Sequence, residues 1–169
     1  MDDTAAKMTL TIEPIQPVHD QAIAEIIRQV GEEFGAVGDG FGPSDAEVDQ
    51  MSQHYNQANK SVYYVALVGD KVVGGCGVAA FEGAPNPETC ELRKLFILPE
   101  YRALGLGRKL TAMCLEFAVQ QGYTQCYLDT LSSMLSAIRL YQKFGFEHLD
   151  QPMPGTIHNG CDVWMQKTL

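Results

Sequence analysis

The alternation of apolar and polar positions divides the chain into segments typical of strands and of helices. Residues 8–14 alternate as a strand does, and from Pro17 to Val30 apolar side chains return at every fourth position, which is typical of a helix. We therefore expect a strand followed by a helix at the start of the chain.

The middle of the chain is dominated by strand-like runs. Residues 62–68 and 71–81 are rich in Val, Tyr and Ala and are separated only by Gly69-Asp70, which predicts a β-hairpin. Three glycines within residues 74–77 predict a bulge or the close approach of another backbone. A fourth strand is expected over residues 89–98, where a proline ends it.

The strongest helical pattern covers residues 104–121. Leu106, Leu110 and Cys114 repeat on one face, and Gly122 supplies the stop. A strand, a helix and two closing strands are then expected at residues 123–130, 133–144, 146–149 and 162–166. This order predicts a mixed α/β (α+β) sandwich around a largely antiparallel sheet.

A glycine-rich loop separates the first helix from the hairpin. It runs from Gly31 to Pro43 and ends at Ser44-Asp-Ala-Glu47. Ser followed three residues later by Glu is the signature of a capping box, so we expect a second helix to begin here.

Length and composition indicate one globular domain over residues 1–169. No apolar run is long enough for a membrane helix, and the first residues do not resemble a signal peptide, so a cytoplasmic location is expected. The five cysteines form an odd set without close pairs and are expected to be small buried thiols. The four histidines match no ligand spacing, so we expect ordinary surface or hydrogen-bonded histidines and no metal.

The charge pattern excludes some partners and draws attention to one segment. A net charge of −9 disfavours nucleic acid and anionic membranes as partners. Residues 1–60 hold eleven acids against three cations, whereas residues 93–109 hold five cations against one acid. A short basic segment thus lies in an acidic chain.

The basic segment contains a turn suited to binding phosphate. The first turn of a helix offers unpaired backbone N–H groups and the positive end of the helix dipole. Gly105 and Gly107 let an anion approach the backbone there, and Arg102, Arg108 and Lys109 add flanking cations. A dinucleotide fingerprint and a P-loop are both disfavoured, because neither pattern is completed.

Three motifs in this order resemble the GNAT superfamily of N-acetyltransferases. Arg102-Ala-Leu-Gly-Leu-Gly107 matches its signature Gln/Arg-x-x-Gly-x-Gly/Ala, residues 91–101 resemble its fourth strand, and residues 136–146 resemble its late Ala-x-x-Leu-Tyr-x-x-x-Gly-Phe element. The resemblance spans roughly residues 62–149. The chain departs from the family pattern at Ala103, where Gly is frequent, and at Met134, where Asn is frequent.

The resemblance implies a fold and a cofactor site. The fold is a sheet of about seven strands flanked by about four helices, with the fourth and fifth strands splayed apart. Acetyl-CoA is the implied acyl donor, with its pantetheine arm in the gap between those strands. The implied coenzyme contacts are Phe96, Ile97, Leu98, Arg102, Leu104, Gly105, Leu106, Gly107, Arg108, Lys109 and Ala137.

The resemblance also implies direct transfer of an acetyl group to a primary amine in a ternary complex. Tyr141 is the candidate acid for the departing thiolate, although its helical periodicity is equally that of a core tyrosine. Glu91 is the candidate base; its alternative is a surface carboxylate paired with Arg93 or Arg102. Asp129 is a weaker candidate, for orienting the amine.

The acceptor is less well specified. Glu32, Glu33 and Asp39 predict an acidic rim, and hence a small cationic amine or a lysine-like group as acceptor. A non-catalytic acyl-CoA-binding or sensor module remains the alternative, because the phosphate cradle and the chemistry are separable. A homodimer is compatible with such a fold, with the last strand near Trp164 pairing across a two-fold axis.

Overall fold

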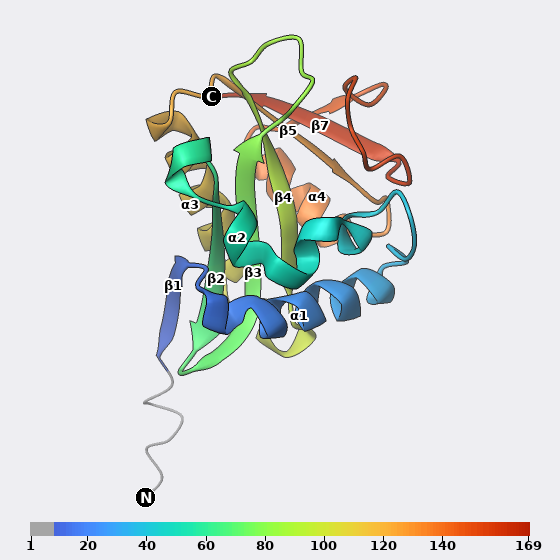
Figure 1. Ribbon diagram of the computed structural model, residues 1–169. Helices are drawn as coiled ribbons and strands as arrows, with labels where there is room; N and C mark the ends of the chain where they lie inside the picture. The colour runs from blue at the N-terminus through green and yellow to red at the C-terminus, as the bar shows by residue number, and fades with distance from the viewer. Residues whose placement is uncertain (1–8) are drawn as a thin grey trace, which may run out of the picture.

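A computed structural model describes residues 9–169 and places seven strands in one sheet (Figure 1). The strand order is β1-β2-β3-β4-β5-β7-β6. The strands are β1 (Leu10–Pro14), β2 (Val62–Val68), β3 (Lys71–Ala80), β4 (Thr89–Ile97), β5 (Gln125–Thr130), β6 (Glu147–Leu149) and β7 (Val163–Thr168). The predicted mixed, largely antiparallel sheet of seven strands is confirmed.

Four α-helices cover the two faces of the sheet. In Figure 1, α1 and α2 lie in front of the sheet, whereas α3 and α4 lie behind it. The helices are α1 (Asp20–Glu33), α2 (Met51–His54), α3 (Leu106–Gln120) and α4 (Leu135–Lys143). Leu106, Leu110 and Cys114 of α3 are fully or almost fully buried, as the periodicity predicts.

The sheet is divided at its centre. β4 and β5 are the only parallel neighbours among the described strands, and they pair over three positions, from Thr89↔Gln125 to Glu91↔Tyr127. Beyond Glu91 the two strands separate although both continue. The predicted splaying of the fourth and fifth strands is therefore observed, and it opens a gap that leads toward α3 and α4.

The glycines of β3 allow close packing. The register between β3 and β4 shifts between Gly75 and Gly77, and a Cβ added to Gly75 would lie 2.4 Å from the ring of Tyr63. The predicted bulge and close approach are both present.

The predicted capping box is wrong, and the second helix does not begin there but at Met51. Ser44 ends a 3-10 turn (Gly42–Ser44), a second 3-10 turn follows (Ala46–Gln50), and α2 has only four residues. The carboxylate of Glu47 does not return to Ser44, because it accepts hydrogen bonds from Tyr55 and Lys94. Tertiary ion pairing has replaced the local cap.

The last strand is not available for the predicted dimer. β7 is paired with β5 on one side and with β6 on the other, where Trp164 lies opposite Leu149. The sheet edges are β1 and β6 instead.

Cys76, Cys90, Cys114 and Cys126 are buried and Cys161 is partly exposed, and all five are free thiols, in line with the sequence. Within residues 9–169, no helix combines the length and apolarity needed to cross a membrane.

Candidate active site

The predicted phosphate cradle lies at the start of α3, next to α4. Gly105 precedes the first helical turn with a φ of 79°, a conformation that only glycine adopts without strain, and a Cβ there would meet nothing within 4 Å. A groove of about 620 Å³ opens at this point and is called the cradle groove below. The predicted coenzyme contacts that line it are Ile97, Arg102, Gly105, Leu106, Gly107, Arg108 and Ala137.

Cations in the cradle groove come from two helices. Arg108 of α3 lines it as predicted, but Lys109 and Leu104 are exposed beside it rather than in its lining. Arg139 and Lys143, one turn apart on α4, also line it and were missed in the sequence. Their spacing of four residues was the available signal, since it places both on one helical face.

Arg102 is held by neighbouring parts of the protein. Its terminal nitrogens bind the carboxylate of Glu33 at 2.7 and 2.8 Å, and its Nε donates to the carbonyl of Ile97 at 3.0 Å. Arg102 therefore joins the end of α1 to the loop before α3, and Glu33 compensates its charge. The prediction that Glu33 contributes to an acidic acceptor rim is wrong for this reason.

Ala103 occupies a strained position in the same loop. Its φ is 66°, in the left-handed region that disfavours side chains. This backbone conformation explains why Gly is frequent at this position in the family pattern.

At the edge of β4 that faces the gap, the backbone N–H of Ile97 points away from β3. The N–H of Leu98 donates to Val73 of β3 at 2.9 Å, so by the alternation of an antiparallel ladder the N–H and C=O of Ile97 point the other way. The carbonyl of Ile97 accepts from Arg102, which leaves its N–H toward the gap. The three predicted pantetheine contacts differ in their positions. Ile97 lines the cradle groove, and Phe96 lines a small pocket in the centre of the gap, which is described below. The backbone N–H of Leu98 is hydrogen-bonded to β3.

A bulge in β4 turns Lys94 inward. Gly75 pairs with Phe96 and Gly77 with Arg93, so two residues of β4 oppose one of β3, and Lys94 has a φ of 54°. The Lys94 side chain is 2% exposed and its Nζ lies 2.7 Å from Asp45. The bulge thereby anchors the segment before α2 to the centre of the sheet.

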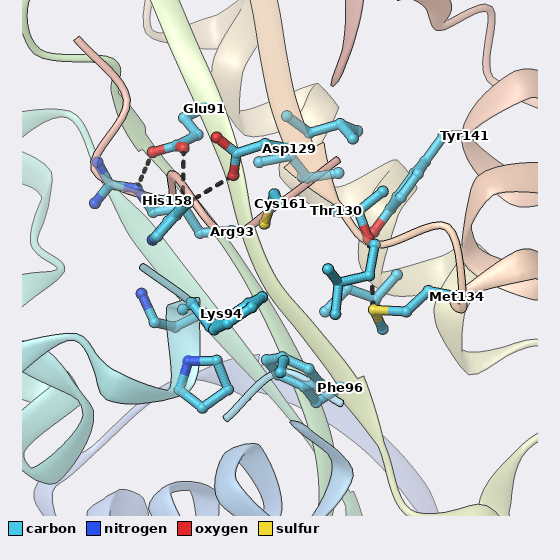
Figure 2. A pocket seen from close by; sticks show the side chains of 18 residues that line it. Glu91, Arg93, Lys94, Phe96, Asp129, Thr130, Met134, Tyr141, His158 and Cys161 are labelled. Atoms are coloured by element: carbon cyan, nitrogen blue, oxygen red, sulfur yellow. Dashed lines mark hydrogen bonds and ion pairs between the residues drawn. The ribbon is translucent and has the colours of Figure 1, made fainter. Parts of the chain in front are cut away.

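Tyr141 and Glu91 both line a small central pocket in the gap (Figure 2). Tyr141 is buried and its ring packs edge-on against Phe146. Within residues 9–169 its hydroxyl has no hydrogen-bond partner, and burial raises its pKa far above the ordinary value, so the hydroxyl keeps its proton at neutral pH. It can therefore act as a proton donor.

Glu91 is buried rather than on the surface. Its side chain is 6% exposed and accepts a hydrogen bond from Arg93 Nε at 2.7 Å, so the alternative of a surface ion pair was right about Arg93 and wrong about exposure. Burial raises the pKa of Glu91; Arg93 opposes this effect, and the nearby carboxylate of Asp129 adds to it. Glu91 is therefore a stronger base than an ordinary glutamate.

His158 connects the centre of the pocket to the surrounding loops. Nδ1 lies 2.9 Å from Asp129 and Nε2 lies 2.8 Å from Asp45. Burial alone would lower the pKa of His158, but the hydrogen bonds to Asp129 and Asp45 outweigh it and raise the pKa to about 10. His158 is hydrogen-bonded, which was one of the two expectations for the histidines, but nothing in the sequence indicated that it lies in the site as a buried imidazolium.

Glu91, Asp129 and His158 are also the residues of the described chain whose ligand atoms cluster as in a metal site, all within 4.8 Å of one another. Nδ1 of His158 lies 2.9 Å from Asp129 and 3.7 Å from Glu91, so in this structure the three side chains are joined by ion pairs.

A second, larger pocket lies on the side of the central pocket that faces away from the cradle groove. It has a volume of about 510 Å³, and we call it the acceptor-side pocket. It shares Glu91, Arg93 and His158 with the central pocket, which in turn shares Leu95 and Met134 with the cradle groove. The three cavities therefore adjoin one another, and the central pocket lies between β4 and β5. The acidic residues that line the acceptor-side pocket are Asp45, Glu47, Glu82 and Glu91. The predicted Glu32 and Asp39 do not line it.

Comparison with known proteins agrees with this arrangement. Residues 29–146 match the model of the acetyltransferase (GNAT) family. The chain is 40% identical over 149 residues to the uncharacterized N-acetyltransferase YjgM of Escherichia coli, covering 88% of each protein.

Solved structures show the same fold at low sequence identity. An acetyltransferase of the GNAT family from Staphylococcus aureus superposes with a TM-score of 0.78 at 18% identity, over 95% of this chain and 99% of that one. The PaiA N-acetyltransferase of Thermoplasma acidophilum, solved in complex with coenzyme A, gives 0.75 at 16% identity, over 96% and 100%.

Proposed function

Because the chain belongs to the GNAT family and is an N-acetyltransferase that uses acetyl-CoA, we propose that it transfers the acetyl group directly to a primary amine bound in the acceptor-side pocket. Both substrates are bound at once, and no covalent enzyme intermediate forms. The acceptor is a small molecule or a lysine-like group.

The observation that carries this proposal is the sequence of three adjoining cavities, of which the central one lies between β4 and β5. The cradle groove lies at one end and the acceptor-side pocket at the other. The central pocket between them holds a buried carboxylate and a buried phenol, Glu91 and Tyr141. A thioester that enters from one end and an amine that enters from the other would meet between these two groups.

Coenzyme binding is assigned to the cradle groove. The pyrophosphate is placed at the first turn of α3, where backbone N–H groups and the helix dipole favour an anion and where Arg108, Arg139 and Lys143 supply charge. The pantetheine arm is placed along β4, with an amide carbonyl accepting from the N–H of Ile97 as a neighbouring strand would.

The chemistry needs one base and one acid. Glu91 accepts a proton from the incoming ammonium, and the neutral amine attacks the thioester carbonyl. The new C–N bond forms, the C–S bond breaks, and Tyr141 donates its proton to the leaving thiolate. The attacking nitrogen then loses its second proton, which restores Tyr141, and Glu91 releases the first proton to solvent. Asp129 lies beside Glu91 and orients the amine. Glu91 and Tyr141 are the proposed catalytic residues.

The test is a steady-state measurement of thiol release from acetyl-CoA with a panel of primary amines. Direct transfer predicts initial-rate lines that intersect when both substrates are varied, whereas a covalent acetyl-enzyme gives parallel lines. Parallel lines, or a burst of thiol release without amine, would refute direct transfer. Melting temperature measured with acetyl-CoA and coenzyme A checks donor binding separately, because a ligand of the folded state raises it.

A further inference from the structure

One cation of the acceptor-side pocket has donors to spare. The Arg93 side chain is 21% exposed and lines this pocket. Its Nε donates to Glu91 at 2.7 Å, and Nη2 donates to the carbonyl of Ala80 at 3.3 Å. Nη1 lies 3.7 Å from Glu47, beyond hydrogen-bond distance. The hydroxyl of Tyr55 is a further hydrogen-bond partner of Arg93, so among the described residues three of the five N–H groups of this guanidinium have acceptors and two do not.

Glu47 is the neighbouring carboxylate that comes within ion-pair distance of those donors, at 3.7 Å, and it has other partners as well. Glu47 is engaged by Lys94 and by the hydroxyl of Tyr55. Asp45 lies 2.7 Å from Lys94 and 2.8 Å from His158. Each of these carboxylates already has its cation, so the terminal nitrogens of Arg93 remain for a group that enters the pocket.

Asp129 accepts hydrogen bonds from the hydroxyl of Thr156 at 2.5 Å and from His158 at 2.9 Å, which leaves acceptor sites on its carboxylate for the amine. The Glu91–Arg93 ion pair lines both the central pocket and the acceptor-side pocket, so an acceptor meets both of its charges. An ion pair whose two charges both face the substrate is complementary to a zwitterion, which carries one charge of each sign.

The path of the acceptor brings its two ends to these two groups. The amine has to reach Glu91, which borders both pockets, and the rest of the molecule then extends past Arg93. Resting on the proposed function, we propose that the acceptor is a free α-amino acid, whose carboxylate is bound by the terminal nitrogens of Arg93 while its amine faces Glu91. Arg93 is then the residue that sets acceptor specificity.

A planar guanidinium suits this role because it binds carboxylates through two parallel hydrogen bonds. A pocket with buried donors discriminates strongly against a substrate that lacks the matching acceptor, because the donors are then left unpaired. The carboxylate should therefore affect kcat/KM far more than the amino-acid side chain, which extends toward Ala80, Phe81 and Ile157.

The first test needs only the unmodified protein. Acetyl transfer is measured with the twenty common α-amino acids, and the best acceptor is then compared with its α-carboxamide and with its decarboxylated amine. We expect kcat/KM to fall roughly 10- to 100-fold when the carboxylate is removed, the range for a hydrogen bond to a charged group. An equal or higher kcat/KM for the decarboxylated amine overturns the proposal. A preference for the carboxamide also overturns it, and indicates a peptide N-terminus.

A variant assigns the effect to Arg93. Arg93→Gln should reduce the ratio of kcat/KM for the amino acid to that for its decarboxylated amine to within a fewfold of one. The ratio cancels any effect on Glu91, which acts on both substrates. Arg28→Gln is the matched control, because Arg28 forms an exposed pair with Asp49 and should leave the ratio unchanged. An unchanged ratio in folded Arg93→Gln overturns the assignment.

The two proposals fail in different ways. If simple amines or lysine analogues are acetylated well and α-amino acids are not, direct transfer stands and the amino-acid acceptor is wrong. If thiol is released with α-amino acids but parallel initial-rate lines are seen, the acceptor stands and direct transfer is wrong.

Discussion

Replacement of His158 by glutamine should remove a pH-dependent contribution to stability. The imidazolium of His158 lies between Asp129 and Asp45, at 2.9 and 2.8 Å, and its side chain is 9% exposed. Its pKa is raised from 6.5 to about 10 in the folded protein. Because the folded state binds this proton more tightly than the unfolded state, the stabilisation is fully present below pH 6.5 and is lost as the pH rises to 10.

The size of the effect follows from the same two values. A rise from 6.5 to about 10 spans roughly 3.5 pH units, and at about 1.4 kcal/mol per unit the upper limit is about 5 kcal/mol. Removing one partner of a buried ion pair typically costs about 3 to 5 kcal/mol. We expect His158→Gln to lower the free energy of unfolding by about 3 kcal/mol at pH 6.5, which corresponds to roughly 6 to 12 °C in melting temperature.

The assay is urea unfolding of the wild type and the variant at pH 6.5, 8 and 9.5. Other groups that titrate in this range do so in both proteins, so the difference between the two unfolding free energies isolates His158. That difference in unfolding free energy should shrink to below about 1 kcal/mol at the highest of the three pH values. A difference that is independent of pH would refute the buried imidazolium. His54→Gln is the control, because His54 is exposed.

Four further substitutions test the site and the cradle loop. Glu91→Gln should lower kcat/KM by roughly 10²- to 10⁴-fold and abolish the rise of rate with pH through its raised pKa, measured as a pH–rate profile. Tyr141→Phe should lower kcat about 10- to 100-fold with little change in KM for acetyl-CoA, and an unchanged kcat across pH would reject Tyr141 as the acid. Ala103→Gly should raise the melting temperature by roughly 2 to 4 °C, since relieving a φ of 66° returns about 1 kcal/mol, and Gly105→Ala should lower it similarly; equal melting temperatures would contradict the strain.

Local patterns in the sequence predicted the elements but not every contact between them. The helix at residues 106–120 and the glycine turn before it depend on periodicity and on backbone conformation, which are written within a few residues. Glu91 and Tyr141 were found because motif spacing fixes their places on β4 and α4. Each of these features is local or belongs to a recognisable motif.

The ion-pair network could not be found in the same way. His158 and Asp45 are 113 positions apart and lie in loops, so no spacing rule connects them. The failed capping box has the same origin, because Glu47 is locally suited to a cap but is captured by Lys94 from β4. Pairings made by tertiary structure override local preference wherever buried charges need partners.

The short pairing of β4 with β5 also determines how the protein should open. Backbone hydrogen bonds bridge the two strands over three residue pairs only, so strands β1 to β4 and strands β5 to β7 form two blocks joined by a seam. Amide hydrogen exchange at Ile97 and in the outer half of β5 should therefore be faster than in β3, where ladders run on both sides. A pantetheine arm lying in the seam would form hydrogen bonds with β4 as a neighbouring strand would. Coenzyme A should slow exchange along this seam more than at the sheet edges, linking cofactor binding to the rigidity of the two blocks.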